Sequence, residues 1–132
     1  MLKEYPGRVR LIFKDLPLAS HALARPAHEA ARCAGALGRY WPYHDKLFAN
    51  QPSFERADLV RYAGEVGLPR EKFTACLDAR RFAPDVEADV EQARAIGVRG
   101  TPTFIINGRV VAGALPVEDF RTVIDEALKD KP

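Results

Sequence analysis

The chain has 132 residues, of which 47% are hydrophobic and 29% are charged, and this length and composition fit one globular domain with a packed core. Its 20 Lys and Arg residues nearly balance 18 Asp and Glu residues, giving a net charge of +2, so the chain lacks the concentrated basic face of a nucleic-acid-binding protein. No apolar stretch approaches the roughly 20 residues that span a bilayer, and we expect neither a nucleic acid nor a membrane as partner.

The first element predicted is a strand at Arg8–Phe13. Its sequence, RVRLIF, alternates polar and apolar residues before it closes on an apolar run, and Pro17 follows it. The run LIF is much shorter than the roughly 7–15 apolar residues of a secretory signal. The sequence as written therefore predicts a cytoplasmic location.

Helices are predicted through the middle of the chain. Alanine is the best helix former and proline is tolerated in a first turn, which favours an alanine-rich helix from about Pro26 to Leu37. The next helix ends at Ala49 and carries an aromatic cluster around Trp41, which we expect to pack in the core rather than line a groove. Ser53 is the predicted N-cap of a third helix.

Two more helices follow, one started by Pro69 and one opened by Pro84 and ended by Gly97. Apolar residues at helical spacing, from Val86 to Ile96, mark the inward face of the second of these.

The last third of the chain predicts a hairpin and a final helix. Thr103–Ile106 is a short apolar strand, and Asn107-Gly108 is a strong hairpin signal before a return strand at residues 110–112. Pro116 opens a helix with an apolar face. Strands at both ends with helices between them predict an α/β fold with an antiparallel pair at one end.

The segment GVRGTPTFIINGRVVAGALP, Gly97–Pro116, resembles the C-terminal half of the thioredoxin fold. It is most similar to the DsbA-like thiol:disulfide oxidoreductases, whose hallmark is Gly-x-x-Gly-Thr-Pro-Thr-Phe followed by a strand, Asn-Gly and a return strand. The upstream text LIFKDLPL and YWPYHDKLFANQ is similar to the same family. The resemblance runs from about Arg8 to Leu128. It implies a thioredoxin-like α/β fold in one domain over residues 1–132, with a helical insertion at about residues 22–96.

The departure from the family is at the front of the chain. Family members begin with a strand, a Cys-x-x-Cys motif and a helix, all ahead of the strand that Arg8–Phe13 resembles, and this sequence has no Cys-x-x-Cys. We therefore expect an N-terminally truncated, redox-inactive fold with no catalytic residue, serving as a peptide-binding or interaction module. The alternatives are a fragment of an active oxidoreductase and a relative of the kappa-type glutathione transferases. The family is typically periplasmic or extracytoplasmic.

Cys33 and Cys76 each lie inside a predicted helix among apolar residues, a setting that does not lower the pKa of a thiol. One interpretation is two small buried hydrophobic residues. The resemblance implies the other, a structural disulfide between two helices. Two cysteines with His21, His28 and His44 do not form a usual zinc spacing, so we expect no metal and no cofactor. The three histidines are predicted to cap, pack or face solvent.

The resemblance also implies a role for Thr101 and Pro102. In the family this proline is cis, and the preceding residue offers its backbone to a bound polypeptide. The alternative is a trans proline that simply begins a strand. Because the family's central strand is missing, we expect a homodimer in which strands or helices of one chain complete the sheet of the other.

Overall fold

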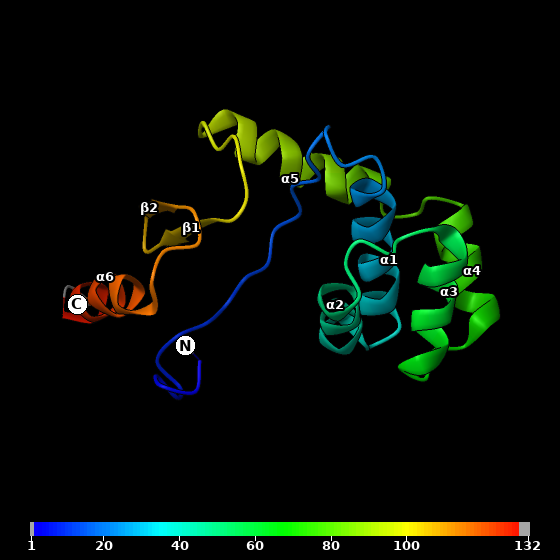
Figure 1. The fold of residues 1–132 in the computed structure, drawn as a ribbon, viewed down its shortest axis with the longest axis horizontal. Coiled ribbons are helices and arrows are strands. Elements are labelled where there is room, and N and C mark those ends of the chain that lie inside the picture. The colour runs from blue at the N-terminus through cyan, green and yellow to red at the C-terminus, as the bar shows by residue number, and fades with distance from the viewer. Residues whose placement is uncertain (1, 130–132) are drawn as a thin grey trace. The chain divides into compact units, whose positions relative to one another are not determined.

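The computed structural model describes residues 2–129 (Figure 1), which divide into two compact units. Of these residues, one unit comprises 15–92, and the other comprises 2–14 together with 93–129. The elements in chain order are α1 (Ala24–Ala36), α2 (Tyr40–Ala49), α3 (Arg56–Glu65), α4 (Arg70–Asp78), α5 (Ala83–Ala95), β1 (Thr103–Ile106), β2 (Arg109–Ala112) and α6 (Val117–Lys129).

The unit of residues 15–92 is helical, with α1 packed against α2, α3 and α4. Three alanines of α1, Ala30, Ala31 and Ala34, are almost fully buried. Small side chains at these positions let neighbouring helices approach α1 closely, as dense interior packing requires. The larger core side chains come from the other helices and include Tyr43, Leu59, Tyr62 and Phe73.

Tyr43 joins two helices through a buried hydrogen bond. Its side chain is fully buried, and its hydroxyl donates to the backbone carbonyl of Leu59 over 2.8 Å. We expect Tyr43→Phe to lower the free energy of unfolding by about 1 kcal/mol, since one net hydrogen bond is lost while the ring packing remains. Urea denaturation measures this change. The Tyr62 hydroxyl donates to the Ser53 carbonyl in a partly buried position. Tyr62→Phe should therefore lower the free energy of unfolding by no more than Tyr43→Phe does, and a larger decrease would contradict the argument from burial.

The start of α3 differs from the prediction. The N-cap residue is Glu55 rather than Ser53, and the Asp58 side chain accepts a hydrogen bond from the Glu55 N–H. An acidic side chain in the first turn also suits the positive end of the helix dipole. The helix ends at Glu65, and Gly67 just beyond it has a φ of +82°, which glycine adopts at little cost.

The second unit is built on the hairpin of β1 and β2 and on α6. The strands pair antiparallel with Phe104 opposite Val111 and Ile105 opposite Val110. Asn107 and Gly108 both have positive φ, at 49° and 88°, as the favoured two-residue hairpin turn requires.

One face of this hairpin packs on α6. The rings of Phe104 and Phe120 meet edge to face with centroids 4.8 Å apart, and Val123 and Ile124 of α6 are buried. The N-terminal residues are tied to the same helix, because the Tyr5 hydroxyl donates to Asp125 over 2.8 Å and Arg121 pairs with Glu4 at 2.6 Å.

The strand predicted at Arg8–Phe13 is not formed: residues 9–18 belong to no helix or strand (Figure 1). A strand needs a neighbour for its backbone groups. In the described residues the sheet consists of β1 and β2 alone, and neither pairs with this segment. The segment with the alternating sequence is therefore irregular in the structure.

Two other predictions about side chains are wrong. Trp41 of α2 was expected in the core but is 43% exposed, and Ile96 was expected inward but is 54% exposed. On α2 the neighbouring Tyr43 and Leu47 are the buried residues. Ile96 lies just beyond the last residue of its helix. Among residues 2–129, no helix is long and apolar enough to cross a membrane.

Candidate functional site

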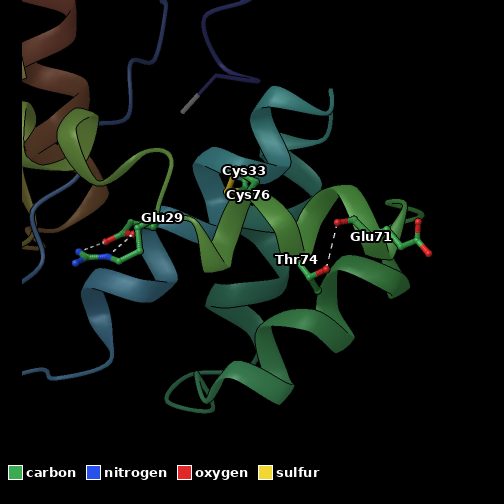
Figure 2. The surroundings of a disulfide bond; sticks show 6 residues. Glu29, Cys33, Glu71, Thr74 and Cys76 are labelled. Carbon is green, nitrogen blue, oxygen red and sulfur yellow. Dashed lines mark hydrogen bonds and ion pairs between the residues drawn. A yellow bond between two sulfur atoms is a disulfide. The ribbon is translucent and has the colours of Figure 1, made fainter.

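The two cysteines are joined in the structure. Cys33 in α1 and Cys76 in α4 form a disulfide with their Cα atoms 5.9 Å apart (Figure 2). Helical spacing places both residues on the inward faces of their helices, and only 1% of Cys33 and 9% of Cys76 is exposed. The bond therefore fastens two helices that are already packed against each other.

A shallow hollow of about 520 Å³ lies over this disulfide. Its walls are mostly apolar, and the positively charged side chains of Lys72 and Arg81 also line it. The guanidinium of Arg81 lies over the Phe82 ring, 5.2 Å from the ring centroid. Cys33 and Cys76 both contribute to the lining of the hollow.

The setting of these sulfurs does not suit a catalytic dithiol. A reactive thiolate needs a helix N-terminus or close cations to lower its pKa, together with a resolving partner near in sequence. Cys33 and Cys76 lie well inside their helices and are 43 positions apart. Both cysteines of the chain are consumed in this bond, and neither is free.

The Thr101–Pro102 loop lies in the other unit, and its peptide bond is cis. The loop is fixed from both sides. The Thr103 hydroxyl donates to the Gly100 carbonyl over 2.7 Å, and the Pro102 carbonyl accepts from the Gly113 N–H over 2.8 Å. Thr101 and Pro102 are exposed.

The backbone N–H and carbonyl of Thr101 are the groups that could bind a polypeptide. Neither its N–H nor its carbonyl bonds to any residue within the described range 2–129. Because backbone groups seek partners, an extended polypeptide could hydrogen-bond there. The structure thus brings Cys33 to Cys76 and holds Thr101 beside Pro102, but the two pairs belong to different units.

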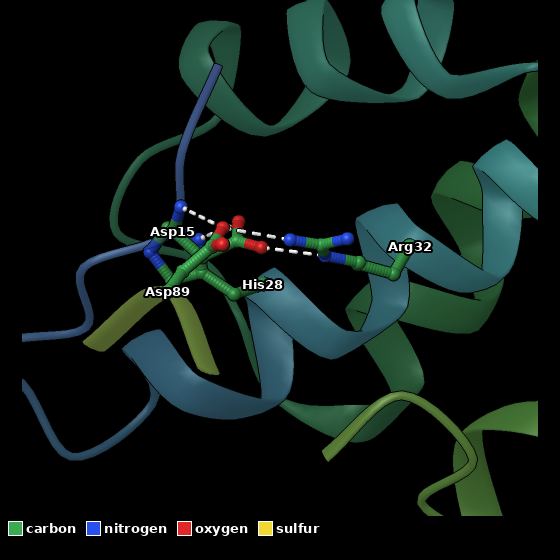
Figure 3. A network of polar contacts seen from close by, with 4 residues as sticks. All are labelled: Asp15, His28, Arg32 and Asp89. Atoms are coloured by element: carbon green, nitrogen blue, oxygen red, sulfur yellow. Dashed lines mark hydrogen bonds and ion pairs between the residues drawn. The ribbon is translucent and has the colours of Figure 1, made fainter. Parts of the chain in front are cut away.

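A buried polar cluster was not predicted from the sequence. Asp15, which precedes α1, receives hydrogen bonds from His28 and Arg32 of α1, each 2.7 Å long (Figure 3). Arg32 also reaches Asp89 of α5 at 2.7 Å, and Asp89 accepts the backbone N–H of Asp15 at 2.9 Å. The cluster joins α5 and the entry to α1, with only 2% of Asp15 exposed.

The charges in this cluster compensate one another. Burial alone would raise the pKa of the Asp15 carboxyl, but the hydrogen bonds and charges of His28 and Arg32 lower that pKa below its ordinary value. Burial likewise lowers the pKa of Arg32, and Asp15 and Asp89 together raise it above its ordinary value. An ionised Asp15 can only accept, so the Nδ1 of His28 carries the proton of their hydrogen bond.

The three histidines have different surroundings. His28 was predicted to cap a helix, pack or face solvent, but it is part of the buried polar cluster through its contact with Asp15. His44 of α2 contacts the carboxylate of the next residue, Asp45, at 3.1 Å. In residues 2–129, no group of three or more His, Cys, Asp and Glu residues is placed to hold a metal ion.

Comparison with known proteins gives two findings. The family model described as Thioredoxin matches residues 1–126. The chain is also 38% identical over 128 residues to the Na(+)/H(+) antiporter NhaA 3 of Salinispora tropica, covering 96% of this chain and 20% of that protein. It is 37% identical over 115 residues to the Na(+)/H(+) antiporter NhaA of Herminiimonas arsenicoxydans, covering 87% of this chain and 18% of that protein.

The chain thus spans about one fifth of the length of the curated relatives it matches. The family match extends over nearly the whole chain, through the helices, the cis-proline loop and the hairpin into α6. Helices combined with a small two-stranded sheet agree with the α/β thioredoxin-like fold expected from the sequence. The chain belongs to the thioredoxin family.

Proposed function

We propose that this chain is a DsbA-like member of the thioredoxin family that binds an extended polypeptide at Thr101 and Pro102 and does not itself catalyse disulfide exchange. The observation that carries the proposal is the state of its cysteines. Both are bonded to each other inside packed helices, and no Cys-x-x-Cys occurs in the chain. What remains of the family's apparatus is the loop that offers backbone groups to a polypeptide.

Insulin reduction tests the absence of catalysis. The chain is added to insulin and dithiothreitol, and turbidity reports cleavage of the interchain disulfides. We expect the same rate as with the Cys33→Ala/Cys76→Ala variant, because a thiolate at either position would lie buried and without a vicinal partner. A rate clearly above that of the variant would favour the alternative, a fragment of a working oxidoreductase.

Polypeptide binding is tested separately. The probe is the S-carboxymethylated insulin B chain, which is extended and cannot form a mixed disulfide. Backbone amide signals of Thr101 and Thr103 in nitrogen-15 NMR spectra should shift on titration, while those of Leu59 and Thr74 in the other unit should stay. Shifts spread evenly over the chain, or none at the loop, would refute the assignment.

A second candidate function rests on the relatives. Identity of 38% over 96% of this chain to an Na(+)/H(+) antiporter favours a role as an accessory domain of such a transporter. This chain would replace the matching fifth of the Salinispora tropica antiporter, and sodium-dependent proton flux would be measured in everted vesicles. We expect the chimera to exceed an antiporter lacking the region. The role would be rejected if the chimera and the antiporter lacking the region gave equal flux. It would also be rejected if the antiporter lacking the region matched the intact antiporter.

A further inference from the structure

The hairpin of β1 and β2 has one strand edge that carries no charge. Within residues 2–129 the two strands pair only with each other, so each keeps one unpaired edge. Natural proteins protect such edges with charged side chains. β2 begins with Arg109, whereas β1 reads TFII and carries none. The edge of β1 is therefore the one open to another strand.

The outward face of the hairpin is also apolar. Ile105 and Val110 stand opposite each other in the ladder and are 51% and 58% exposed. On the other face, Phe104 meets Phe120 of α6 and Val111 is buried. A two-stranded hairpin is marginal in water unless further strands or a helix support it, and here α6 supports one face only.

The same unit contains a segment with the sequence pattern of a strand. Residues 9–12 belong to no helix or strand, and they form no hydrogen bond with any residue in the described part of the chain. Leu11 and Ile12 are 49% and 60% exposed. In an extended conformation Val9 and Leu11 would face one side and Arg10 and Ile12 the other.

We propose that two copies of the chain exchange this segment, so that residues 9–12 of each copy pair with the free edge of β1 in the other. Among the described residues of one chain, the segment and the outer edge of β1 have no strand partner, although Glu4 and Tyr5 hold the start of the N-terminal segment to α6. Insertion brings Ile12 of one copy beside Ile105 of the other. The uncharged edge of β1 accepts Arg10 of the segment without charge repulsion, whereas the edge of β2 carries Arg109 and would repel it. Reciprocal exchange makes two identical interfaces about a two-fold axis.

Size exclusion with light scattering is the first test. The wild-type chain at micromolar concentration should have twice the mass of one chain. Leu11→Pro should halve that mass, because proline cannot donate to a strand ladder. The helical signal in far-UV circular dichroism should stay, because Leu11 lies outside the helices and makes no hydrogen bond with the described part of its own chain. Ala19→Pro is the matched control, placed in the second position of a turn closed by a His21 to Leu18 hydrogen bond, and should remain dimeric.

Cross-linking locates the contact. Both native cysteines are bonded, so Ile12→Cys and Ile105→Cys would introduce the only free thiols. Mixing chains that carry one variant each should give a disulfide-linked product of double mass under mild oxidation.

Several results would overturn the proposal. A wild-type monomer excludes the exchange, and so does a dimer that Leu11→Pro leaves intact. A double variant of one chain that closes an internal disulfide at monomer mass would show that residues 9–12 reach β1 of their own chain instead.

Discussion

Replacing Cys33 and Cys76 together with alanine is expected to lower the free energy of unfolding by about 4 kcal/mol. The disulfide closes a loop between positions 43 apart, and in the chain-entropy model such a crosslink restricts the unfolded chain by about that amount. Alanine adds no buried polar group, and both positions already lie among small or apolar residues.

Urea denaturation of the oxidised chain and of the variant measures this difference. A reducing agent should shift the midpoint of the wild-type chain toward that of the variant and leave the variant itself unchanged, which separates loss of the crosslink from loss of packing. Coincident midpoints for oxidised wild type and variant would show that packing alone holds α1 and α4 together.

The elements best predicted from the sequence are those with strong local signals. Asn107-Gly108 needs positive φ at both residues, and the structure provides it between β1 and β2. The alanine run similarly produces α1, because alanine needs no distant partner to favour a helix. Local signals determine local structure, so these elements were predictable.

Arg8–Phe13 shows where such reasoning fails. Its alternation is a proper strand pattern, but a strand exists only beside another strand. Whether a neighbour is present depends on the whole chain, and the described residues provide none. The same limit applies to Trp41, since the sequence indicates an aromatic cluster on α2 but not which of its members are buried.

The polar cluster was missed for a related reason. Asp15, His28 and Asp89 lie far apart in the sequence, and no motif connects them. His28 and Arg32 are four positions apart on α1, a spacing that puts them on one side of the helix. That spacing was a usable signal, but its acidic partners come from outside the helix and required the fold. The pairing of Cys33 with Cys76 was left open because sequence position alone does not bring two helices together.

Asp15→Asn is expected to lower the free energy of unfolding by about 3 kcal/mol near neutral pH. The substitution keeps the size of the side chain but removes the negative charge that faces His28 and Arg32 in a nearly fully buried position. Breaking one partner of a buried pair leaves the other charge poorly compensated, which costs about this much. Asp89 still accepts from Arg32, so the loss falls short of complete disruption.

The pH dependence of this loss follows from the pKa of Asp15. That pKa is lower in the folded chain than in the unfolded one, so the carboxylate stabilises the fold fully above the ordinary aspartate pKa of about 4. The stabilisation is lost as the pH falls through the lowered folded pKa. The difference between wild type and Asp15→Asn should therefore stay constant from neutral pH to about pH 5 and shrink below about pH 4. Asp78→Asn is the control, because the Asp78–Arg56 pair is exposed and its removal should change stability far less. Denaturation midpoints measured across this range for all three chains test the argument, and a loss at Asp15 that matches the control or ignores pH would contradict it.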